Sequence, residues 1–305
     1  MKKAGKYLLK GLLAVFAALP LKVHYFNARW IGWLARVVLR YRVDVVMDNL
    51  RGSFPEKTEE EIRKICREFY RHFGDVVVEA VWFGGCRNAE RLRKARIVEI
   101  ADVKPLNVLF EKAPSVVVMY SHCGNWELLG GIESYNYTDD PSYFREDNYC
   151  VVYKKMTSAV WDEVMRDNRF APLKDRDGFP GYVETNSLIR YVISNKDKKK
   201  FINVNTDQRP YASARGSVPV HFLNRDCTSM AAAAGLAAKC GFAVAYQRMR
   251  KDRHGHYTIE YVPICEDASG KDVQQIMQTF YDYLEEDIKA QPANYLWTHK
   301  RFKKI

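Results

Sequence analysis

The sequence lacks the cysteine pattern that a disulfide framework or a zinc site requires. Its seven cysteines are odd in number and scattered, and no two of them form a Cys-x-x-Cys pair. Disulfides hold together small secreted domains, and zinc ligands come in closely spaced pairs. The cysteine usage therefore favours a reducing compartment and predicts no metal site.

Linkers and repeats are also missing. No shift in composition, no stretch rich in Pro, Gly and Ser and no internal repeat divides the 305 residues. Since 47% of the residues are hydrophobic, the chain can bury a sizeable core. We expect one large catalytic domain over residues 41–305, preceded by a helical segment over residues 1–40.

No signature of nucleic-acid binding accompanies the formal net charge of +11. Zinc-finger spacing, an RNP-like box and a helix-turn-helix pattern are all absent, and the basic residues are spread along the chain, so nucleic acid is not an expected partner. An acidic membrane surface, an acidic protein or a phosphorylated substrate are the partners that the charge favours.

No apolar run is long enough to span a bilayer, which takes about 20 residues. Residues 11–21 form an uninterrupted apolar run bounded by Lys10 and Lys22, and a second apolar segment covers residues 30–39. The basic start has no convincing Ala-x-Ala cleavage site, so export is not expected. Interleaved basic and aromatic residues predict a helical hairpin in the membrane interface, with two core helices or one marginal span as alternatives.

The chain is organised around the stretch from Pro114 to Gly131. Residues 115–120 are apolar and β-branched with turn residues on both sides, which predicts a buried strand of a parallel sheet. Asn125 predicts the N-cap of a helix that follows. His122 then lies at the carboxyl end of a strand, where open α/β sheets bind their ligands.

His122 and Glu127 are five residues apart, so they could not touch on a continuous helix but could meet across a turn. Gly124 gives this turn freedom to fold back, so Glu127 is expected to accept the proton of one ring nitrogen while the other faces substrate. An imidazole held in this way is a general base. A structural histidine beside a capping glutamate is the alternative, and Cys123 as a nucleophile is disfavoured because neighbours in sequence point apart.

Further polar residues stand at the ends of other predicted elements. A helix ends near Arg169, and a strand over residues 201–205 leads into Asp207 and Gln208. A carboxylate at the carboxyl end of a strand is well placed to share a pocket with His122. A solvated arginine at the helix end and an aspartate that only caps a turn are the alternatives.

Strands and helices alternate along the chain, which predicts an α/β fold with a mostly parallel central sheet flanked by helices. The predicted strands cover residues 115–120, 148–153, 201–205, 242–246 and 257–264. Three predicted helices cover residues 161–169, 228–240 and 272–290, and two more begin near residues 58 and 126.

Several segments resemble, in the same order, those of the bacterial lipid A late acyltransferases, a family of the lysophospholipid acyltransferase superfamily. The resemblance runs from about Tyr41 to Lys303. The matching segments are Asp48-Asn-Leu with Ser53-Phe-Pro-Glu, the H-x4-E box from His122 to Glu127, the pair Asp207-Gln208, the stretch from Gly216 to Asn224, and Pro292-Ala-Asn-Tyr-Leu-Trp-Thr-His-Lys-Arg-Phe-Lys303. Without the family, the last of these is an aromatic and basic strip suited to a phosphate or membrane surface.

The resemblance implies transfer of a fatty acyl group from an acyl carrier protein thioester to a hydroxyl of a lipid A precursor. His122 would be the general base and Glu127 would orient it. Arg169, with Arg166 as the fallback, would contact substrate. Transfer is expected to be direct, without an acyl-enzyme, a metal, a nucleotide or any other cofactor.

Asp207 and Gln208 are the further substrate-contacting residues that the resemblance implies. Turn amides near Gly124, or Arg169, could supply the donors that an oxyanion needs. The partners would be acyl carrier protein, an anionic lipid acceptor and the membrane surface, at the cytoplasmic face of the inner membrane, with a peripheral or single N-terminal anchor.

Three other functions stay open at this point. The acceptor could be a lysophospholipid or an aminolipid. The chain could be a non-catalytic protein of the same fold that binds anionic lipid. It could also be a thioesterase, with water as the acceptor.

Overall fold

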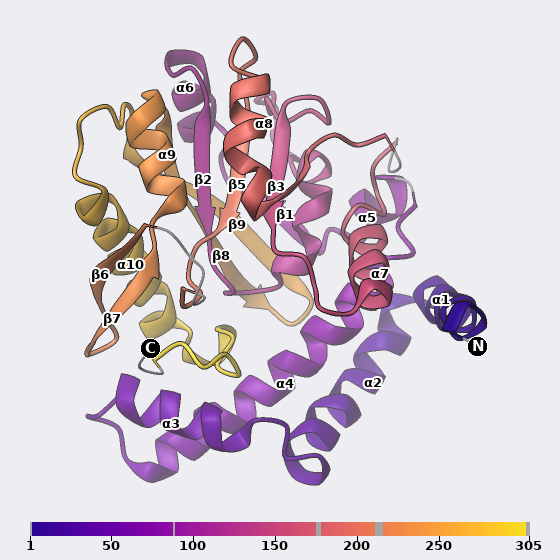
Figure 1. The fold of residues 1–305 in the computed structure, drawn as a ribbon. Helices are drawn as coiled ribbons and strands as arrows, with labels where there is room; N and C mark the ends of the chain where they lie inside the picture. The colour runs from indigo at the N-terminus through magenta and orange to yellow at the C-terminus, as the bar shows by residue number, and fades with distance from the viewer. Residues whose placement is uncertain (1, 88, 175–177, 211–215, 303–305) are drawn as a thin grey trace.

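The computed structural model describes residues 2–87, 89–174, 178–210 and 216–302 (Figure 1). Lys303, the last residue of the tail motif, lies outside this range. The helices are α1 (Lys2–Ala18), α2 (Leu21–Trp33), the π-helical turn η1 (Leu34–Val38), α3 (Val43–Ser53), α4 (Glu59–Phe83), α5 (Ala89–Ala95), α6 (Lys104–Lys112), α7 (Ala159–Arg169), α8 (Leu188–Ser194), α9 (Ala232–Cys240) and α10 (Val273–Ala290), with 3-10 turns η2 (Trp126–Ser134), η3 (Thr185–Ser187) and η4 (Pro292–Asn294).

The strands form a mostly parallel sheet, as predicted. They are β1 (Val98–Ile100), β2 (Val116–Tyr120), β3 (Tyr149–Tyr153), β4 (Tyr182–Glu184), β5 (Phe201–Asn205), β6 (Ser217–Phe222), β7 (Arg225–Met230), β8 (Ala243–Arg253) and β9 (His256–Cys265). Within the described chain, seven of them make one sheet in the order β1-β9-β8-β2-β5-β3-β4. Strands β8, β2, β5, β3 and β4 run parallel, and β9 pairs antiparallel with β8. The molecule is a mixed α/β single domain.

Strand β2 lies in the middle of the sheet, between β8 and β5, with helices on both faces (Figure 1). All five of its residues are buried, which explains its unbroken apolar sequence. Val117 and Met119 join the core on the side of α4 and α10, and Val116 and Val118 join the core on the side of α6. Tyr120 stands opposite Asn205, so β2 and β5 end level with each other.

Most predicted boundaries agree with the structure to within two residues, and three elements differ. Strand β8 continues seven residues beyond its predicted end at residue 246. The segment after Asn125 is a 3-10 turn instead of an α-helix, although the Asn125 side chain caps it as predicted by accepting from the backbone N of Glu127. Residues 228–230, predicted as helix, belong to β7. The reason is the β6–β7 hairpin, whose turn residues Leu223 and Asn224 take φ values of 50° and 61°. Pairing across this hairpin outweighs the helix preference of the small residues that follow.

Helix α2 packs against α4 through small residues. A Cβ on Gly32 would stand 2.2 Å from the carbonyl oxygen of Tyr70, and a Cβ on Gly74 would stand 2.1 Å from that of Ala28. Only glycine therefore allows the two helices to come this close. Through α2, the N-terminal segment thus packs one of its faces against the rest of the domain.

The other face of this N-terminal segment is apolar and exposed. In the described chain no single helix has the length and hydropathy to cross a bilayer, while Tyr7–Ala18 and Leu21–Val38 meet that test only together and are bent by 117°. Its exposed large apolar residues, here called the hairpin surface, are Tyr7, Leu8, Leu12, Val15, Phe16, Val23, Phe26, Trp30, Trp33, Leu34, Val37, Val38, Leu39 and Tyr41.

Candidate active site

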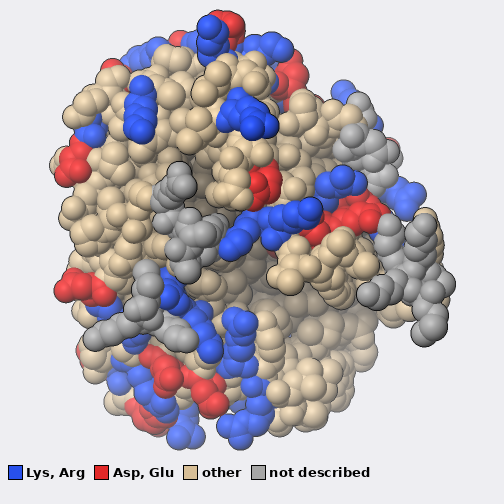
Figure 2. Space-filling model, in the orientation of Figure 1, with Lys and Arg blue, Asp and Glu red and all other residues tan. Residues whose placement is uncertain are grey.

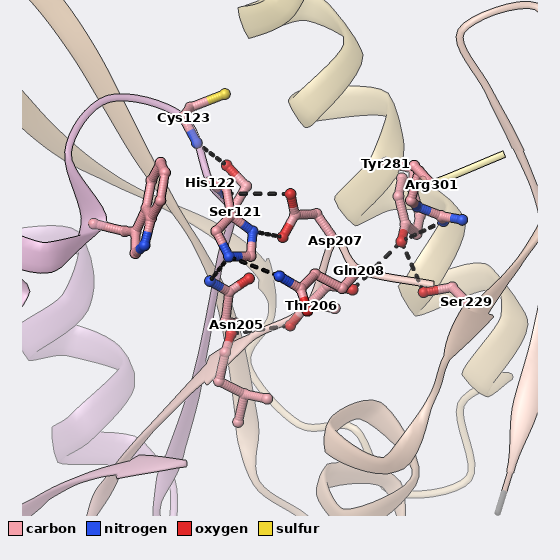
Figure 3. A network of polar contacts seen from close by, with 12 residues as sticks. Ser121, His122, Cys123, Asn205, Thr206, Asp207, Gln208, Ser229, Tyr281 and Arg301 are labelled. Carbon is pink, nitrogen blue, oxygen red and sulfur yellow. Dashed lines mark hydrogen bonds and ion pairs between the residues drawn. The ribbon is translucent and has the colours of Figure 1, made fainter. Parts of the chain in front are cut away.

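His122 and Asp207 meet at the carboxyl edge of the sheet (Figure 3). His122 lies two residues after Tyr120, where β2 ends, and Asp207 lies two residues after Asn205, where β5 ends. The ring Nδ1 of His122 is 2.7 Å from Oδ1 of Asp207, and the backbone N of His122 donates to Oδ2 at 3.2 Å. Because an ionised carboxylate can only accept, Nδ1 carries the proton and Nε2 keeps its lone pair.

Both members of this pair are buried. Asp207 is 1% exposed and His122 is 7% exposed. Burial alone would raise the pKa of Asp207, but the charge and hydrogen bonds of His122 lower this pKa below its ordinary value. An ionised Asp207 is therefore in position to stabilise a protonated imidazole.

Glu127 does not accept the ring proton of His122, so this part of the sequence prediction is wrong. Its Oε2 and Oε1 accept from Nε and Nη2 of Arg169, each at 2.8 Å, and Oε1 also accepts from the Trp126 indole at 3.0 Å. Burial would raise the pKa of Glu127, but Arg169 lowers it below its usual range. Bidentate pairing with arginine is a strong carboxylate interaction, and Asp207 already occupies Nδ1 of the imidazole.

Arg169 reaches Glu127 because η2 passes very close to the end of α7. A Cβ on Gly130 would stand 1.6 Å from the carbonyl oxygen of Arg169, so the approach requires glycine there. Arg169 therefore lies in the site, as the partner of Glu127. Arg166, the fallback, is half-exposed and pairs with its neighbour Asp167 at 3.3 Å.

Two side-chain amides face the free ring nitrogen of His122 (Figure 3). Nδ2 of Asn205 is 3.1 Å from Nε2, and Nε2 of Gln208 is 3.0 Å from it. Amide nitrogens donate, so this arrangement agrees with a proton on Nδ1. Gln208 was predicted as a site residue and Asn205 was not. The available signal was a polar residue at the end of a buried strand, two positions before Asp207.

The Nε2 side of His122 opens into a cavity of about 310 Å³. Its walls come from the sheet edge, η2, α7 and the start of α8 and α9. The lining residues are Tyr120, His122, Trp126, Leu129, Gly130, Ile132, Tyr149, Val151, Val152, Tyr153, Lys154, Met156, Arg169, Phe170, Thr185, Leu188, Asn203, Val204, Asn205, Thr206, Gln208, Met230, Ala232, Ala233 and Gln247. A mostly apolar cavity with a few converging polar groups is typical of a small-molecule or lipid-chain site.

The C-terminal segment holds the His122 turn, residues 121–125, through its backbone. Gly124 N donates to the carbonyl of Asn294 at 3.0 Å, and Leu296 N donates to the carbonyl of His122 at 3.2 Å. Tyr295 also hydrogen bonds to Asp207. The tail motif thus supports both members of the histidine–aspartate pair.

Arg301, the second basic residue of the tail motif, is also part of this support. It is 2% exposed, and its Nη2 donates to the Tyr281 hydroxyl at 2.7 Å. That hydroxyl donates to the carbonyl of Thr206 at 3.3 Å, next to Asp207 (Figure 3). Since Trp297 is fully buried as well, these two side chains do not form the solvent-facing strip that the sequence alone suggests.

Cys123 follows His122 in the sequence, but the two side chains point in different directions. Its thiol is buried and points away from the imidazole (Figure 3), and burial raises its pKa well above the ordinary value. A thiol of this kind is a poor nucleophile. Among the described residues, no group of three or more His, Cys, Asp and Glu side chains is arranged to hold a metal ion.

Behind the turn, Glu79 of α4 is completely buried and tied to Asn125. It accepts from Nδ2 of Asn125 at 2.7 Å, from the Tyr257 hydroxyl at 2.8 Å and from the Tyr25 hydroxyl at 3.0 Å. Burial raises the pKa of Glu79 to about 7, a rise that the Asn125 hydrogen bond and Lys251 only partly offset and Asp75 reinforces. Asn125, the cap after the His122 turn, is therefore hydrogen-bonded to a carboxyl group, Glu79, whose pKa is about 7.

The raised pKa of Glu79 makes the stability of the fold depend on pH. The pKa of Glu79 is near 4.5 in the unfolded chain and about 7 in the folded chain. The stability that the neutral form of Glu79 gives the fold is therefore complete below pH 4.5 and is lost as the pH rises through 7. The loss amounts to about 3 kcal/mol on the scale of 1.36 kcal/mol per pKa unit. Glu79→Gln, which stays neutral, should therefore gain stability over the native chain at pH 8 and not at pH 4.5.

Urea unfolding of both chains between pH 4.5 and 8 measures this difference. Glu68→Gln, on the same helix, is the matched control for the loss of one carboxylate. A difference between Glu79→Gln and the native chain that did not change with pH would contradict the assignment.

These features define an α/β enzyme with an apolar cavity at the carboxyl edge of its sheet. The sequence model of the bacterial lipid A biosynthesis acyltransferase family matches residues 1–304, so the chain belongs to this family and is an acyl-transferring enzyme. The resemblance seen in the sequence motifs is thereby confirmed.

The sequence identity to individual members of the family is low. The chain is 25% identical over 296 residues to the lipid A biosynthesis palmitoleoyltransferase of Escherichia coli K12 and, equally, to a lipid A biosynthesis acyltransferase of Shigella flexneri. It is 22% identical over 300 residues to the lipid A biosynthesis lauroyltransferase of Escherichia coli K12. Each comparison covers 96% of this chain and 89% of the relative. The two E. coli relatives are named for different acyl chains.

Proposed function

We propose that this enzyme moves a fatty acyl group from an acyl carrier protein thioester to a hydroxyl of a lipid A precursor, with His122 as the general base. The observation that carries the proposal is the 2.7 Å contact between Nδ1 of His122 and Oδ1 of Asp207, which leaves the lone pair of Nε2 to accept a proton at the wall of an apolar cavity. Asp207 takes the orienting role that the sequence motif suggested for Glu127.

In this mechanism Nε2 of His122 removes the proton of the acceptor hydroxyl as its oxygen attacks the thioester carbonyl. The resulting imidazolium is stabilised by ionised Asp207. When the intermediate collapses, the carbon–sulfur bond breaks and the thiolate leaves with the proton from Nε2. Glu127 and Arg169 form an ion pair beside the imidazole, and the Trp126 ring packs edge-on against that of His122, with ring centroids 4.7 Å apart.

Charge supports anionic partners for this reaction. The net charge is +11, and Lys and Arg side chains border the hollowed middle of the face in Figure 2. Acyl carrier protein is acidic and a lipid A precursor is phosphorylated, so both suit such a surface. The lining of the cavity, which includes Tyr, Val, Leu, Met and Ala side chains, suits the acyl chain.

A transfer assay with purified components tests the proposal. Acyl carrier protein loaded with a labelled fatty acyl chain is offered with a phosphorylated lipid A precursor, a lysophospholipid or an aminolipid as acceptor. We expect label to enter the lipid A precursor fastest. Preferred labelling of either other acceptor would replace the proposed substrate. Hydrolysis that no acceptor outcompetes would make the protein a thioesterase, and the absence of any turnover would favour a lipid-binding role.

We further propose that the hairpin surface lies in the membrane interface, at the cytoplasmic face of the inner membrane. Phe26 is 70% exposed and Trp30 is 61% exposed, and both stand on α2 opposite the face packed on α4. Lys22 and Arg29, on the same helix, are exposed and could contact anionic headgroups. Aromatic residues with flanking basic residues are the composition of an interfacial helix.

Replacing Phe26 and Trp30 together by serine should weaken binding to vesicles of anionic phospholipid at least about tenfold, since each buried aromatic contributes roughly 1.5–3 kcal/mol. Flotation with vesicles measures the bound fraction. The matched control is the double serine variant of Ile189 and Ile193, which are 67% and 65% exposed on α8. Equal loss in both double variants, or no loss in either, would remove the interfacial assignment.

A further inference from the structure

Acyl transfer requires hydrogen-bond donors for the oxyanion of the tetrahedral intermediate. Three backbone amides of the His122 turn are already in use. Those of His122, Cys123 and Gly124 donate to Asp207 Oδ2 at 3.2 Å, to Ser121 Oγ at 3.2 Å and to the carbonyl of Asn294 at 3.0 Å. Redirecting any of them would break a contact that holds the turn.

Arg169 is committed as well. Its Nε and Nη2 both donate to Glu127 at 2.8 Å, and Tyr182 also hydrogen bonds to it. The amides of residues 122–124 and the Nε and Nη2 atoms of Arg169 are therefore engaged in structural contacts.

The side-chain amides of Asn205 and Gln208 are engaged differently. Each donates to Nε2 of His122, the atom that must accept the proton of the attacking hydroxyl. In the described chain, Oδ1 of Asn205 is buried and has no hydrogen-bond partner, so the contact of Nδ2 with His122 is the side-chain hydrogen bond that positions Asn205. By contrast, Asn203, on the same strand, donates to the carbonyl of Cys150 at 3.0 Å.

We propose that the amides of Asn205 and Gln208 form the oxyanion site, with Asn205 as a catalytic residue. This inference rests on the proposed acyl transfer. When the acceptor hydroxyl binds Nε2 of His122, it displaces both amides from that lone pair. The oxyanion that then forms is joined to the attacking oxygen through one carbon atom, and it lies within reach of donors placed about 3 Å from Nε2.

The step balances without a further reagent. The hydroxyl proton moves to Nε2, the new carbon–oxygen bond forms, and the electron pair of the carbonyl double bond moves to the oxygen that the amides of Asn205 and Gln208 bind. That pair returns as the carbon–sulfur bond breaks, and the thiolate takes the proton from Nε2. The amides thus bind tightly only to the charged intermediate, so they accelerate the chemical step and not ground-state binding.

The test uses two acyl donors and the full-length protein. One is the ordinary acyl carrier protein thioester, and the other is the dithioester, in which sulfur replaces the carbonyl oxygen and accepts hydrogen bonds poorly. Asn205→Ala should lower kcat for the thioester by about 10²-fold with little change in KM. The preference of the native enzyme for the thioester over the dithioester should shrink by a similar factor in Asn205→Ala.

Controls separate this role from a structural one. Asn107→Ala removes an amide on α6 that donates to the carbonyl of Pro141, far from His122 in the fold, and should leave both rates and the preference unchanged. If Asn205→Ala fails to fold by thermal unfolding, Asn205→Asp keeps the shape but removes the donor, and it should lose the same preference. A lower kcat with an unchanged preference would overturn the oxyanion role.

The failure of the proposed substrate is distinguishable from the failure of this inference. If the native enzyme does not acylate the lipid A precursor, hydrolysis of the same two donors passes through the same oxyanion and gives the same comparison. A reduced preference in that reaction would support Asn205 while the acceptor assignment falls. If the native enzyme neither transfers nor hydrolyses, both proposals are overturned.

Discussion

The variant His122→Ala should transfer acyl groups at least about 10²-fold more slowly than the native enzyme, because it has no base to remove the hydroxyl proton. The alanine also leaves Asp207 without its main partner, so a change in folding must be separated from a change in chemistry. His122→Gln serves this purpose, since its amide can still donate to Asp207 but cannot accept a proton at neutral pH.

The rates of both variants are measured with labelled acyl carrier protein thioester under single-turnover conditions, and their melting temperatures are compared with that of the native chain. We expect His122→Gln to keep the melting temperature within a few degrees and to be as slow as His122→Ala. Near-normal turnover in either variant would remove His122 as the base.

Asp207→Asn should cost about 10²–10⁴-fold in kcat, the range that follows from losing the carboxylate that orients and stabilises a catalytic imidazole. Asparagine keeps the size of the side chain and can still accept the backbone hydrogen bond from residue 122. It cannot supply the negative charge that an imidazolium requires, and it no longer fixes the proton on Nδ1.

A double-variant cycle decides which carboxylate acts with His122. If Asp207 acts through the imidazole, Asp207→Asn should cause almost no further loss in the His122→Ala background. Glu127→Gln should instead couple to Arg169, since its carboxylate binds that guanidinium at two points. Coupling of His122 to Glu127 and not to Asp207 would restore the partner that the sequence motif suggested.

Much of the scaffold could be predicted from local sequence patterns. The strand β5 was predicted over residues 201–205, where the structure has it, and β2 differs by one residue, because short β-branched runs between turn residues leave few other possibilities. The cap at Asn125 was likewise readable from a single residue.

The pairing inside the site was harder to predict because it depends on strand order. Glu127 is near His122 in sequence, and Asp207 is distant, yet β2 and β5 are neighbours in the sheet and bring Asp207 to the imidazole. Sequence separation says nothing of this adjacency. The bidentate contact of Glu127 with Arg169 depends on the close approach at Gly130, which only the packed structure reveals.

The His122 turn receives contacts from widely separated segments: Glu79 on α4, Asp207 after β5, and the carbonyl of Asn294 beyond α10. Such a centre has a high contact order, so it assembles only when the distant parts of the chain have docked. Under the proposed function, partly folded species would then be unable to hydrolyse the acyl donor. Recovery of turnover during refolding should therefore follow the slowest step of global folding, and it can serve as a sensitive readout of complete native assembly.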